Sequence, residues 1–368
     1  MKRTIALSFI AFLLACSTAW AQKGMKDVMG SYFDVSVAVN VGQTKGENPA
    51  ALKVIRQHYN NVVAENCMKS EEIQPHEGQF YWNDADAFVR FAEENGLSIH
   101  GHCLVWHSQM PQWMKVGRSG NGPTREEMIE RMRNHIYAVV GRYKGRIKSW
   151  DVVNEAFEDD GSPRRTPWYN AIGFDYVVMA FQFAHEADPD AELYYNDYSM
   201  FKPGRRQAVC RLIRLLKANG CRIDGVGMQN HNGMDWPESS EMEASIKAFA
   251  AEGVKVSITE LDLNMLPIPE NFGGAGVEQN YAYDKTMNPY TAGVPRNVQQ
   301  QMDERWMEFF RIYNKYRDKI ERVCFWGVGD GDSWHNDWPV KGRTAYPLLF
   351  DRQYKAKPVL KKIMKMFK

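Results

Sequence analysis

The sequence has no charge excess of either sign, no paired cysteine motif and, beyond its first residues, no long apolar run. Its 368 residues include 46 Lys and Arg against 45 Asp and Glu, which excludes the strongly basic surface of proteins that bind nucleic acid or anionic membranes. No segment after residue 21 approaches the ~20 apolar residues of a membrane-spanning helix. Because 44% of the residues are apolar and only 25% are charged, disorder is excluded as well. We therefore expect a globular protein with no membrane-spanning segment and no nucleic-acid partner.

Cysteines are few, and their spacing does not match a zinc site. The six cysteines include no CxxC pair, and the five beyond residue 21 are an odd number. Cys67 and Cys103 lie at consecutive predicted strands. Buried free thiols are favoured over a bridge between them.

The first 21 residues have the pattern of a signal peptide. Two basic residues precede an apolar stretch from Ile5 to Cys16, and Ala19 and Ala21 have the small-x-small spacing of a cleavage site. We predict cleavage after residue 21, so that residues 22–368 form the mature protein in a secreted or periplasmic location. As an alternative, the four residues that end at Cys16 are a lipobox, and Cys16 carries a lipid anchor.

The remaining chain alternates between strand and helix patterns, without linkers or internal repeats. Apolar runs of strand length cover Tyr32–Val39, Asn61–Asn66, Ser98–Val105, Ile147–Val153, Glu192–Tyr195, Asp224–Met228, Val254–Thr259 and Arg322–Trp326. Helical spacing covers Asp84–Asn95, Arg125–Arg142, Tyr169–Ala187, Gly204–Asn219, Ser240–Glu252 and Val298–Tyr316. Eight strands, each followed by a helix, predict an α/β fold of the (β/α)8 TIM-barrel type. A doubly wound sheet is disfavoured, because the glycine-rich phosphate turn is missing.

One irregular segment, Asn264–Arg296, interrupts this alternation. It is much longer than the 2–6 residues usual for such a connection, and it follows the seventh strand. In a barrel this position lies on the C-terminal face, where active sites are found. We interpret the segment as an enlarged rim loop that shapes substrate access; a surface insertion without function is the alternative.

Polar residues follow seven of the strands, at the end that converges on one mouth in a barrel. Glu155 and Glu260 each come directly after an apolar strand, where an unpaired carboxylate is costly to bury. Two carboxylates flanking a cleft are what glycosidic bond cleavage requires, since one protonates the departing oxygen and the other attacks the anomeric carbon or activates water. We expect His231 to keep Glu260 ionised and oriented, with Asp262 in the same network.

Histidines and tryptophans are also expected at this mouth of the barrel. His100, His102 and His107 resemble the start of a metal-dependent amidohydrolase site, but the fifth strand ends Asn-Asp-Tyr, so the ligand set is incomplete and no metal or other cofactor is expected. Tryptophans at or just after strand ends are suited to stack on sugar rings: Trp106, Trp326, Trp334 and Trp338. Three others lie in or beside regular elements and are expected in the core: Trp82, Trp150 and Trp306.

With these residues identified, the chain resembles glycoside hydrolase family 10, the retaining endo-β-1,4-xylanases, from about Met29 to its C-terminus. Gly101–Gln109 resembles the third-strand signature of that family, with Cys103 where Thr is usual. Trp150–Glu155 resembles its acid/base segment and Ile258–Asp262 its nucleophile segment.

The resemblance implies a role for each matching residue. Glu155 would be the general acid/base and Glu260 the nucleophile, with their carboxyl groups ~5–5.5 Å apart. Sugar contacts at the cleavage point and its glycone side would come from Asn154, Lys69, His102 and Gln229, with Trp106 and Trp326 as walls. Asn66, Gln109 and Trp334 would line the next subsite, and Tyr198 would face the leaving group.

The sequence thus predicts a single-domain monomeric enzyme that acts on xylan and xylo-oligosaccharides. Two alternatives stay open at this point. One is a related β-1,4-glycanase that acts mainly on cello-oligosaccharides, and the other is a catalytically silent barrel that binds glycans.

Overall fold

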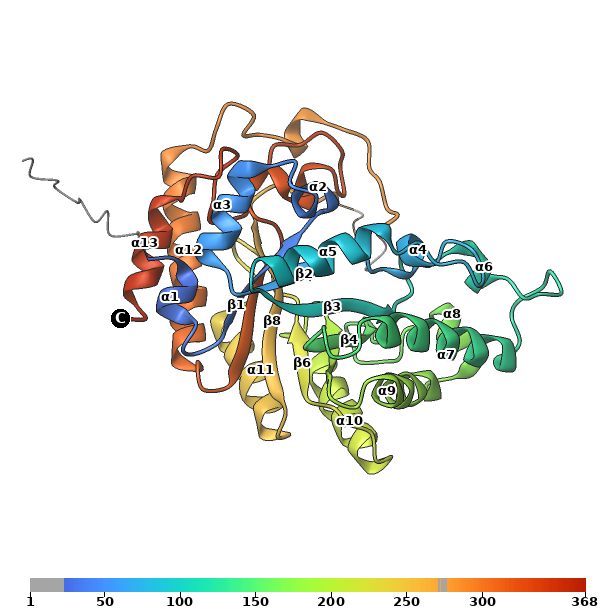
Figure 1. The fold of residues 1–368 in the computed structure, drawn as a ribbon. Coiled ribbons are helices and arrows are strands. Elements are labelled where there is room, and N and C mark those ends of the chain that lie inside the picture. Colours follow the sequence, from blue (N-terminus) through green and yellow to red (C-terminus); the bar gives the residue numbers. More distant parts are fainter. Residues whose placement is uncertain (1–22, 271, 273–276) are drawn as a thin grey trace, which may run out of the picture.

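A computed structural model describes residues 23–270, 272 and 277–368 (Figure 1). The predicted signal peptide, with the cleavage site after residue 21 and the alternative lipid anchor at Cys16, lies outside the described residues. No described helix combines the length and the apolar character needed to cross a bilayer.

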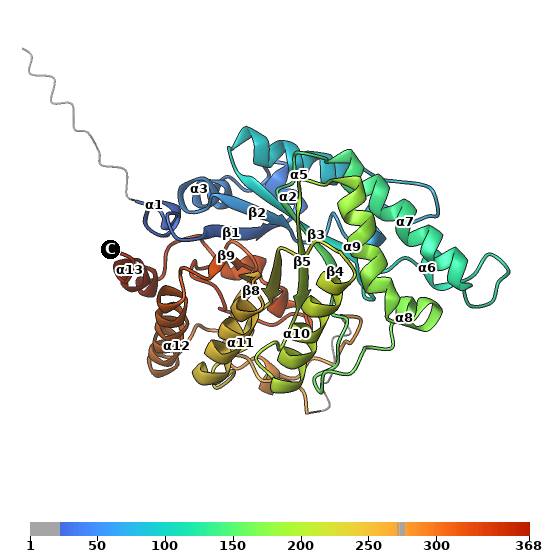
Figure 2. The same cartoon turned by 90° about the horizontal axis from the view of Figure 1, so that it is seen from below.

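Parallel strands form a closed barrel, as predicted. Its eight strands are β1 (Asp34–Val39), β2 (Asn61–Ala64), β3 (Ser98–Val105), β4 (Ser149–Asn154), β5 (Glu192–Asp197), β6 (Gly225–Met228), β8 (Lys255–Asn264) and β9 (Ile320–Phe325). They pair in chain order, and the pairings β1 with β9 and β6 with β8 close the ring, which Figure 2 shows from below. A short additional strand, β7 (His231–Gly233), pairs with the upper part of β8 and was not predicted.

A long helix follows each barrel strand and packs on the outside. These helices are α3 (Pro49–His58), α5 (Asn83–Glu94), α7 (Arg125–Arg142), α9 (Asp175–Ala187), α10 (Pro203–Ala218), α11 (Ser239–Ala251), α12 (Arg296–Lys315) and α13 (Pro358–Lys365). Shorter helical segments are α1 (Met25–Met29), α2 (Val41–Thr44), α4 (Ser70–Ile73), α6 (Gln112–Lys115) and α8 (Pro167–Ile172), with 3-10 turns at Lys285–Met287, Asp330–Asp332 and Trp334–Asn336.

Local sequence explains how these helices begin and which face they bury. In α7, the Thr124 hydroxyl accepts a hydrogen bond from the backbone N–H of Glu127, whose carboxylate accepts one from the Thr124 N–H. An apolar stripe of α7, at Met128, Met132, Ile136, Val139 and Val140, is fully buried.

One predicted helix is wrong in its extent. The apolar spacing predicts a single helix over Tyr169–Ala187, whereas the chain forms α8 and then α9. Gly173 separates them with φ +82°, a conformation that ends a right-handed helix and that glycine adopts without steric cost. Periodicity missed this break because the apolar spacing continues on both sides of it.

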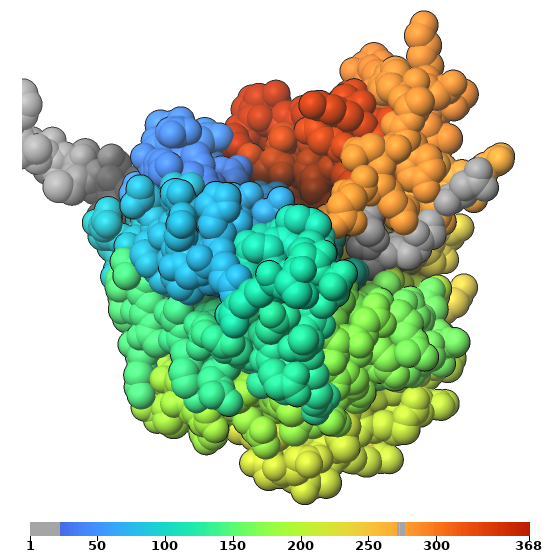
Figure 3. All heavy atoms as spheres, turned by 90° about the vertical axis from the view of Figure 1, so that its right-hand side faces the viewer, coloured from blue at the N-terminus to red at the C-terminus, as the bar shows by residue number. Residues whose placement is uncertain are grey.

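The segment between β8 and α12 is the predicted enlarged loop. Figure 3 shows it in orange, beside the red C-terminal segment. It packs on the residues that follow β9: Tyr281 pairs with Val340, and the Tyr346 hydroxyl donates to the Tyr290 carbonyl over 3.0 Å. The two longest connections at the barrel mouth therefore support each other.

The five described cysteines are free, which agrees with the expectation of unpaired thiols. Trp150 and Trp306 are buried core residues as predicted, and Trp82 is half-buried, stacked on Phe80.

Candidate active site

A cavity of about 830 Å³ opens at the C-terminal end of the barrel. Its lining contains both predicted catalytic glutamates, Glu155 and Glu260, and all the predicted sugar-binding residues, namely Asn66, Lys69, His102, Trp106, Gln109, Asn154, Tyr198, Gln229, His231, Trp326 and Trp334. Asp262 lies one layer behind, against His231. The enlarged loop contributes Ile268, Phe272, Val277 and Glu278 to the same lining. Residues separated by almost 270 positions in the chain thus meet at one mouth, because parallel strands end there together.

Glu155 lies directly after β4, and neutral groups donate to its carboxylate. Its side chain accepts hydrogen bonds from Trp106 Nε1 and from Gln229 Nε2, each over 2.9 Å. The residue is 5% exposed. Its backbone has φ +61°, in the left-handed region that side-chain-bearing residues adopt only when their surroundings hold them there.

Glu260 lies within β8, and its carboxylate faces a histidine. Its oxygens contact Asn196 Nδ2 at 2.8 Å and His231 Nε2 at 3.1 Å. Burial is the largest single influence and raises the pKa of this carboxyl group, but the hydrogen bonds from His231 and Asn196 and the charges of His102 and His231 together outweigh it, so the pKa lies below its usual range. Glu260 is therefore ionised at neutral pH.

Beside Glu260, the half-buried His231 and the buried carboxylate of Asp262 form the predicted network. Burial lowers the pKa of His231, but its contacts with Asp262 and Glu260 raise it to about 10. The imidazolium then donates from Nε2 to Glu260 and from Nδ1 to Asp262 Oδ2, over 2.9 Å. The two carboxylates thus hold one protonated histidine between them.

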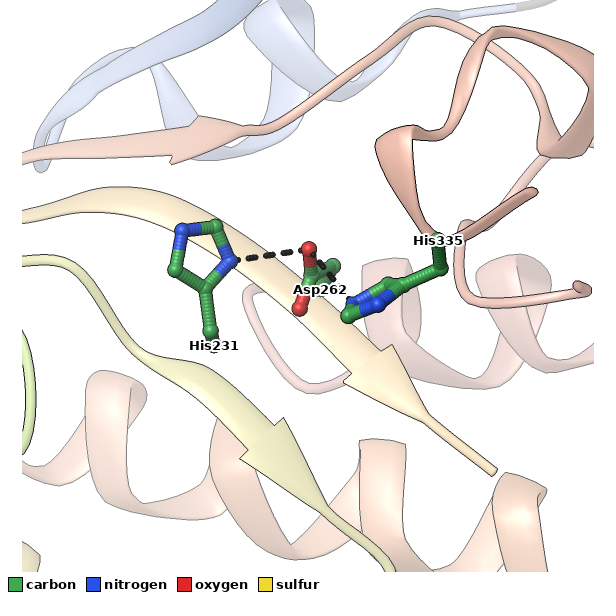
Figure 4. Close-up of side chains that lie close together, drawn as sticks. All are labelled: His231, Asp262 and His335. Atoms are coloured by element: carbon green, nitrogen blue, oxygen red, sulfur yellow. Dashed lines mark hydrogen bonds and ion pairs between the residues drawn. The ribbon is translucent and has the colours of Figure 1, made fainter. Parts of the chain in front are cut away.

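Asp262 also contacts His335, which was not singled out in the sequence (Figure 4). His335 Nε2 lies 3.2 Å from Asp262 Oδ2, and Trp334 Nε1 donates to the same oxygen over 2.8 Å. Although burial alone would raise the pKa of Asp262, His231 and His335 hold it well below its usual range. In the sequence, the signal for His335 is that it is a polar residue next to Trp334. Its position in a loop does not predict where its side chain points.

One possible metal-ligand atom from each of His231, Asp262 and His335 lies within 4.8 Å of the others, a spacing compatible with a metal site. One oxygen of Asp262 already accepts from His231 and from the Trp334 N–H, with His335 Nε2 3.2 Å away. The indole N–H of Trp334 is a donor only and cannot bind a metal. The arrangement therefore fits a hydrogen-bonded carboxylate better than a metal ligand set.

The histidines that suggested an amidohydrolase also contact a carboxylate. His100 Nε2 and His102 Nδ1 each lie 2.9 Å from the buried carboxylate of Asp151. Both imidazoles flank Asp151 on the barrel interior, and His102 presents its ring to the cavity. Asp151 therefore holds both rings in place.

A lysine held by two amides and a pair of stacked tryptophans also line the cavity. Lys69 Nζ donates to Asn66 Oδ1 over 2.9 Å and to Gln109 Oε1 over 2.7 Å, and burial lowers its pKa. Trp334 stacks on Trp338, with ring centroids 4.6 Å apart. Trp338, which the sequence placed near the groove, also lines the cavity, as do Phe201 and Trp236, which sequence reasoning missed.

Comparison with known proteins places this cavity in a family. The model of glycosyl hydrolase family 10 matches residues 24–366. The chain is 54% identical over 358 residues to endo-1,4-beta-xylanase A of Xylanibacter ruminicola, covering 97% of each chain, and 36% identical to beta-1,4-xylanase of Dictyoglomus thermophilum, covering 98% of this chain and 96% of that one. A solved GH10 endoxylanase retrieved from a sugarcane soil metagenome superposes with a TM-score of 0.89 at 43% identity, covering 93% of this chain and all of the other. The chain belongs to glycosyl hydrolase family 10.

Proposed function

We propose that the chain is a secreted endo-1,4-β-xylanase that cleaves internal β-1,4-xylosidic bonds of xylan with retention of configuration. The observation that carries this proposal is the pair of buried glutamates in one cavity, each with a different set of hydrogen-bond partners. The names of the relatives support xylan as the substrate.

The reaction runs in two displacements. Glu260, kept ionised by His231, attacks the anomeric carbon, while Glu155 gives its proton to the glycosidic oxygen as the carbon–oxygen bond breaks. Glu155, now a carboxylate, then takes a proton from water, and the water oxygen displaces Glu260 from the sugar. Two inversions at one carbon give net retention, and the mechanism requires a carboxyl separation of ~5–5.5 Å.

The remaining lining residues would bind the chain of sugars. We assign Asn154 to the 2-hydroxyl at the cleavage point, and Lys69, His102 and Gln229 to the same or the neighbouring glycone sugar. Asn66, Gln109 and Trp334 would form the next subsite, and Trp106 and Trp326 would wall the cleavage point. Trp334 would also exclude the extra hydroxymethyl group of glucose, and Tyr198 would face the leaving group.

Side-by-side release of reducing ends from xylan and from carboxymethylcellulose tests the substrate, and proton NMR of the first product anomer tests retention. We expect rapid release from xylan alone, with the β-anomer formed first. Faster release from carboxymethylcellulose would instead support a cello-oligosaccharide enzyme. No release, together with xylan binding by both the native chain and Glu155→Gln, would support a silent glycan-binding barrel.

Export is proposed to follow cleavage of the signal peptide after residue 21. The intact mass of the exported protein tests this step. A mass that begins at residue 22 is expected, whereas a lipid-modified mass that begins at Cys16 would show anchoring instead.

A further inference from the structure

The backbone around Glu155 is held in place by a partly buried arginine, Arg164, to which the proposed reaction assigns no role. Arg164 Nε donates to the carbonyl oxygen of Glu155 over 3.0 Å, and its Nη2 donates to the carbonyl of Phe157 over 2.9 Å. The side chain is 11% exposed. These bonds fix both ends of the three-residue segment that carries the proposed acid/base.

The same guanidinium also reaches the proposed leaving-group side of the cavity. Arg164 Nη2 donates to the hydroxyl of Tyr198 over 2.6 Å, and the Tyr198 ring lines the cavity. Arg205 of α10 contacts the same two residues: its guanidinium lies 4.0 Å from the Tyr198 ring centroid and donates to the Phe157 carbonyl over 3.0 Å.

This segment needs such support because of its backbone. Glu155 has φ +61°, and a side-chain-bearing residue keeps such a conformation only when neighbouring groups fix it. Its own N–H donates to the Asn196 carbonyl over 2.9 Å, and the next N–H, of Ala156, donates to the Tyr195 hydroxyl over 2.9 Å. Arg164 supplies the donors for the carbonyl side, with a planar fork that a lysine ammonium does not reproduce.

We propose that Arg164 is a positioning residue that ties the acid/base Glu155 to the leaving-group wall at Tyr198. The inference rests on the proposed function. When the leaving sugar binds against Tyr198, Glu155 keeps a fixed position relative to the glycosidic oxygen. This is because one guanidinium, that of Arg164, holds both the Glu155 backbone and the Tyr198 side chain. Arg164 itself neither gives nor takes a proton.

The test compares kcat/KM for aryl β-xylobiosides whose leaving groups differ in their need for a proton. Dinitrophenolate departs without protonation, whereas phenolate needs the acid. We expect Arg164→Lys to lower kcat/KM for phenyl xylobioside by about 100-fold, the usual consequence of a misplaced catalytic group. The dinitrophenyl substrate should be hydrolysed at nearly the native kcat/KM.

Three further variants complete the design. Arg165→Gln is the matched control, because Arg165 is the exposed neighbour and packs over Tyr169; it should leave both substrates unaffected. Glu155→Gln is the benchmark and should show the same dependence on leaving group. Arg164→Gln repeats the measurement without the positive charge, and thermal melting identifies a variant that has not folded.

Equal losses on both substrates in folded Arg164→Lys, or no loss on either, would overturn the positioning role while Glu155→Gln still showed the dependence. A Glu155→Gln variant without that dependence would instead overturn the assignment of Glu155, and the present inference with it.

Discussion

Glu155 and Glu260 are buried to nearly the same extent, 5% and 6% exposed, yet the groups around them differ. Glu260 faces an imidazolium whose pKa is raised to about 10, with the Asp262 carboxylate behind it. Glu155 accepts from neutral groups, among them the indole of Trp106 and the amide of Gln229. A nucleophile must stay ionised, whereas an acid must be able to hold a proton, so the charge of the partners and not the depth of burial separates the two proposed roles.

The surroundings of Glu155 and Glu260 also differ in how they position the carboxylate. Glu260 lies within strand β8, where the register with β9 shifts between Ile258 and Leu261, and its side chain is oriented by other side chains. Glu155 lies just beyond β4 with a left-handed backbone, and it is oriented largely through hydrogen bonds to backbone atoms. Substitutions on the nucleophile side should therefore change ionisation, and those on the acid/base side should change placement.

The largest expected effect comes from removing each carboxylate and supplying azide. Glu260→Ala should lower turnover by about 10⁴-fold or more, as loss of a nucleophile does. Azide should then restore reaction on an activated aryl xylobioside and give the α-glycosyl azide. A single attack by azide replaces the two displacements of the native reaction, so the configuration at the anomeric carbon is inverted. In Glu155→Ala the nucleophile is intact, so azide should intercept the glycosyl-enzyme and give the β-azide.

Proton NMR of the azide products distinguishes the two anomers. The opposite pairing, with the β-azide from Glu260→Ala, would exchange the two assignments. Glu278→Ala, which removes a carboxylate from the loop part of the cavity, is the control and should need no azide.

A smaller effect should follow from neutralising the partner of Glu260. In the native chain His231 holds the pKa of Glu260 below its usual range, so in His231→Asn that pKa should rise. The acidic limb of the kcat/KM profile, which reports ionisation of the proposed nucleophile, should then move to higher pH by about one to two units, which lowers kcat/KM by about 10- to 100-fold at pH values below the limb. The dinitrophenyl substrate is used here, because it does not depend on Glu155.

The exposed His185 of α9 provides the control for this experiment, since His185→Asn removes a histidine remote from the cavity. An unmoved acidic limb in His231→Asn would mean that Glu260 stays ionised without its histidine. The contrast between the two carboxylates would then need another cause.

Much of this site could be predicted from the sequence, because strand ends carry the information. Glu155 comes directly after β4 and Glu260 lies in the C-terminal half of β8, just beyond the apolar run that predicted this strand, and the closure of a parallel barrel brings such ends together wherever they lie in the chain. His231 and Asp262 follow the same logic, since each comes directly after or within a strand that ends beside Glu260.

The residues that sequence reasoning missed come from connections without periodicity. Arg164 lies between β4 and α8, and His335 lies in a 3-10 turn after β9. A run of polar residues in such a connection does not predict where any one side chain points, because that depends on backbone turns such as the one at Gly173. The contacts of Arg164 with backbone carbonyls leave no mark in the sequence at all.

The smallest expected effect concerns the aromatic wall beside the nucleophile. Trp338 stacks on Trp334, with an angle of 13° between the rings, and the Trp334 N–H donates to Asp262. Trp338→Ala should raise KM for xylo-oligosaccharides by about 3–10-fold, the worth of one aromatic stack, with kcat unchanged because no bond of His231 involves Trp338. Trp82→Ala removes a comparable stacked tryptophan outside the cavity and should leave KM unaffected. A fall in kcat together with a shifted acidic limb would show instead that the wall and the ionisation of Glu260 act as one unit, and the nucleophile side would then depend on packing as much as on charge.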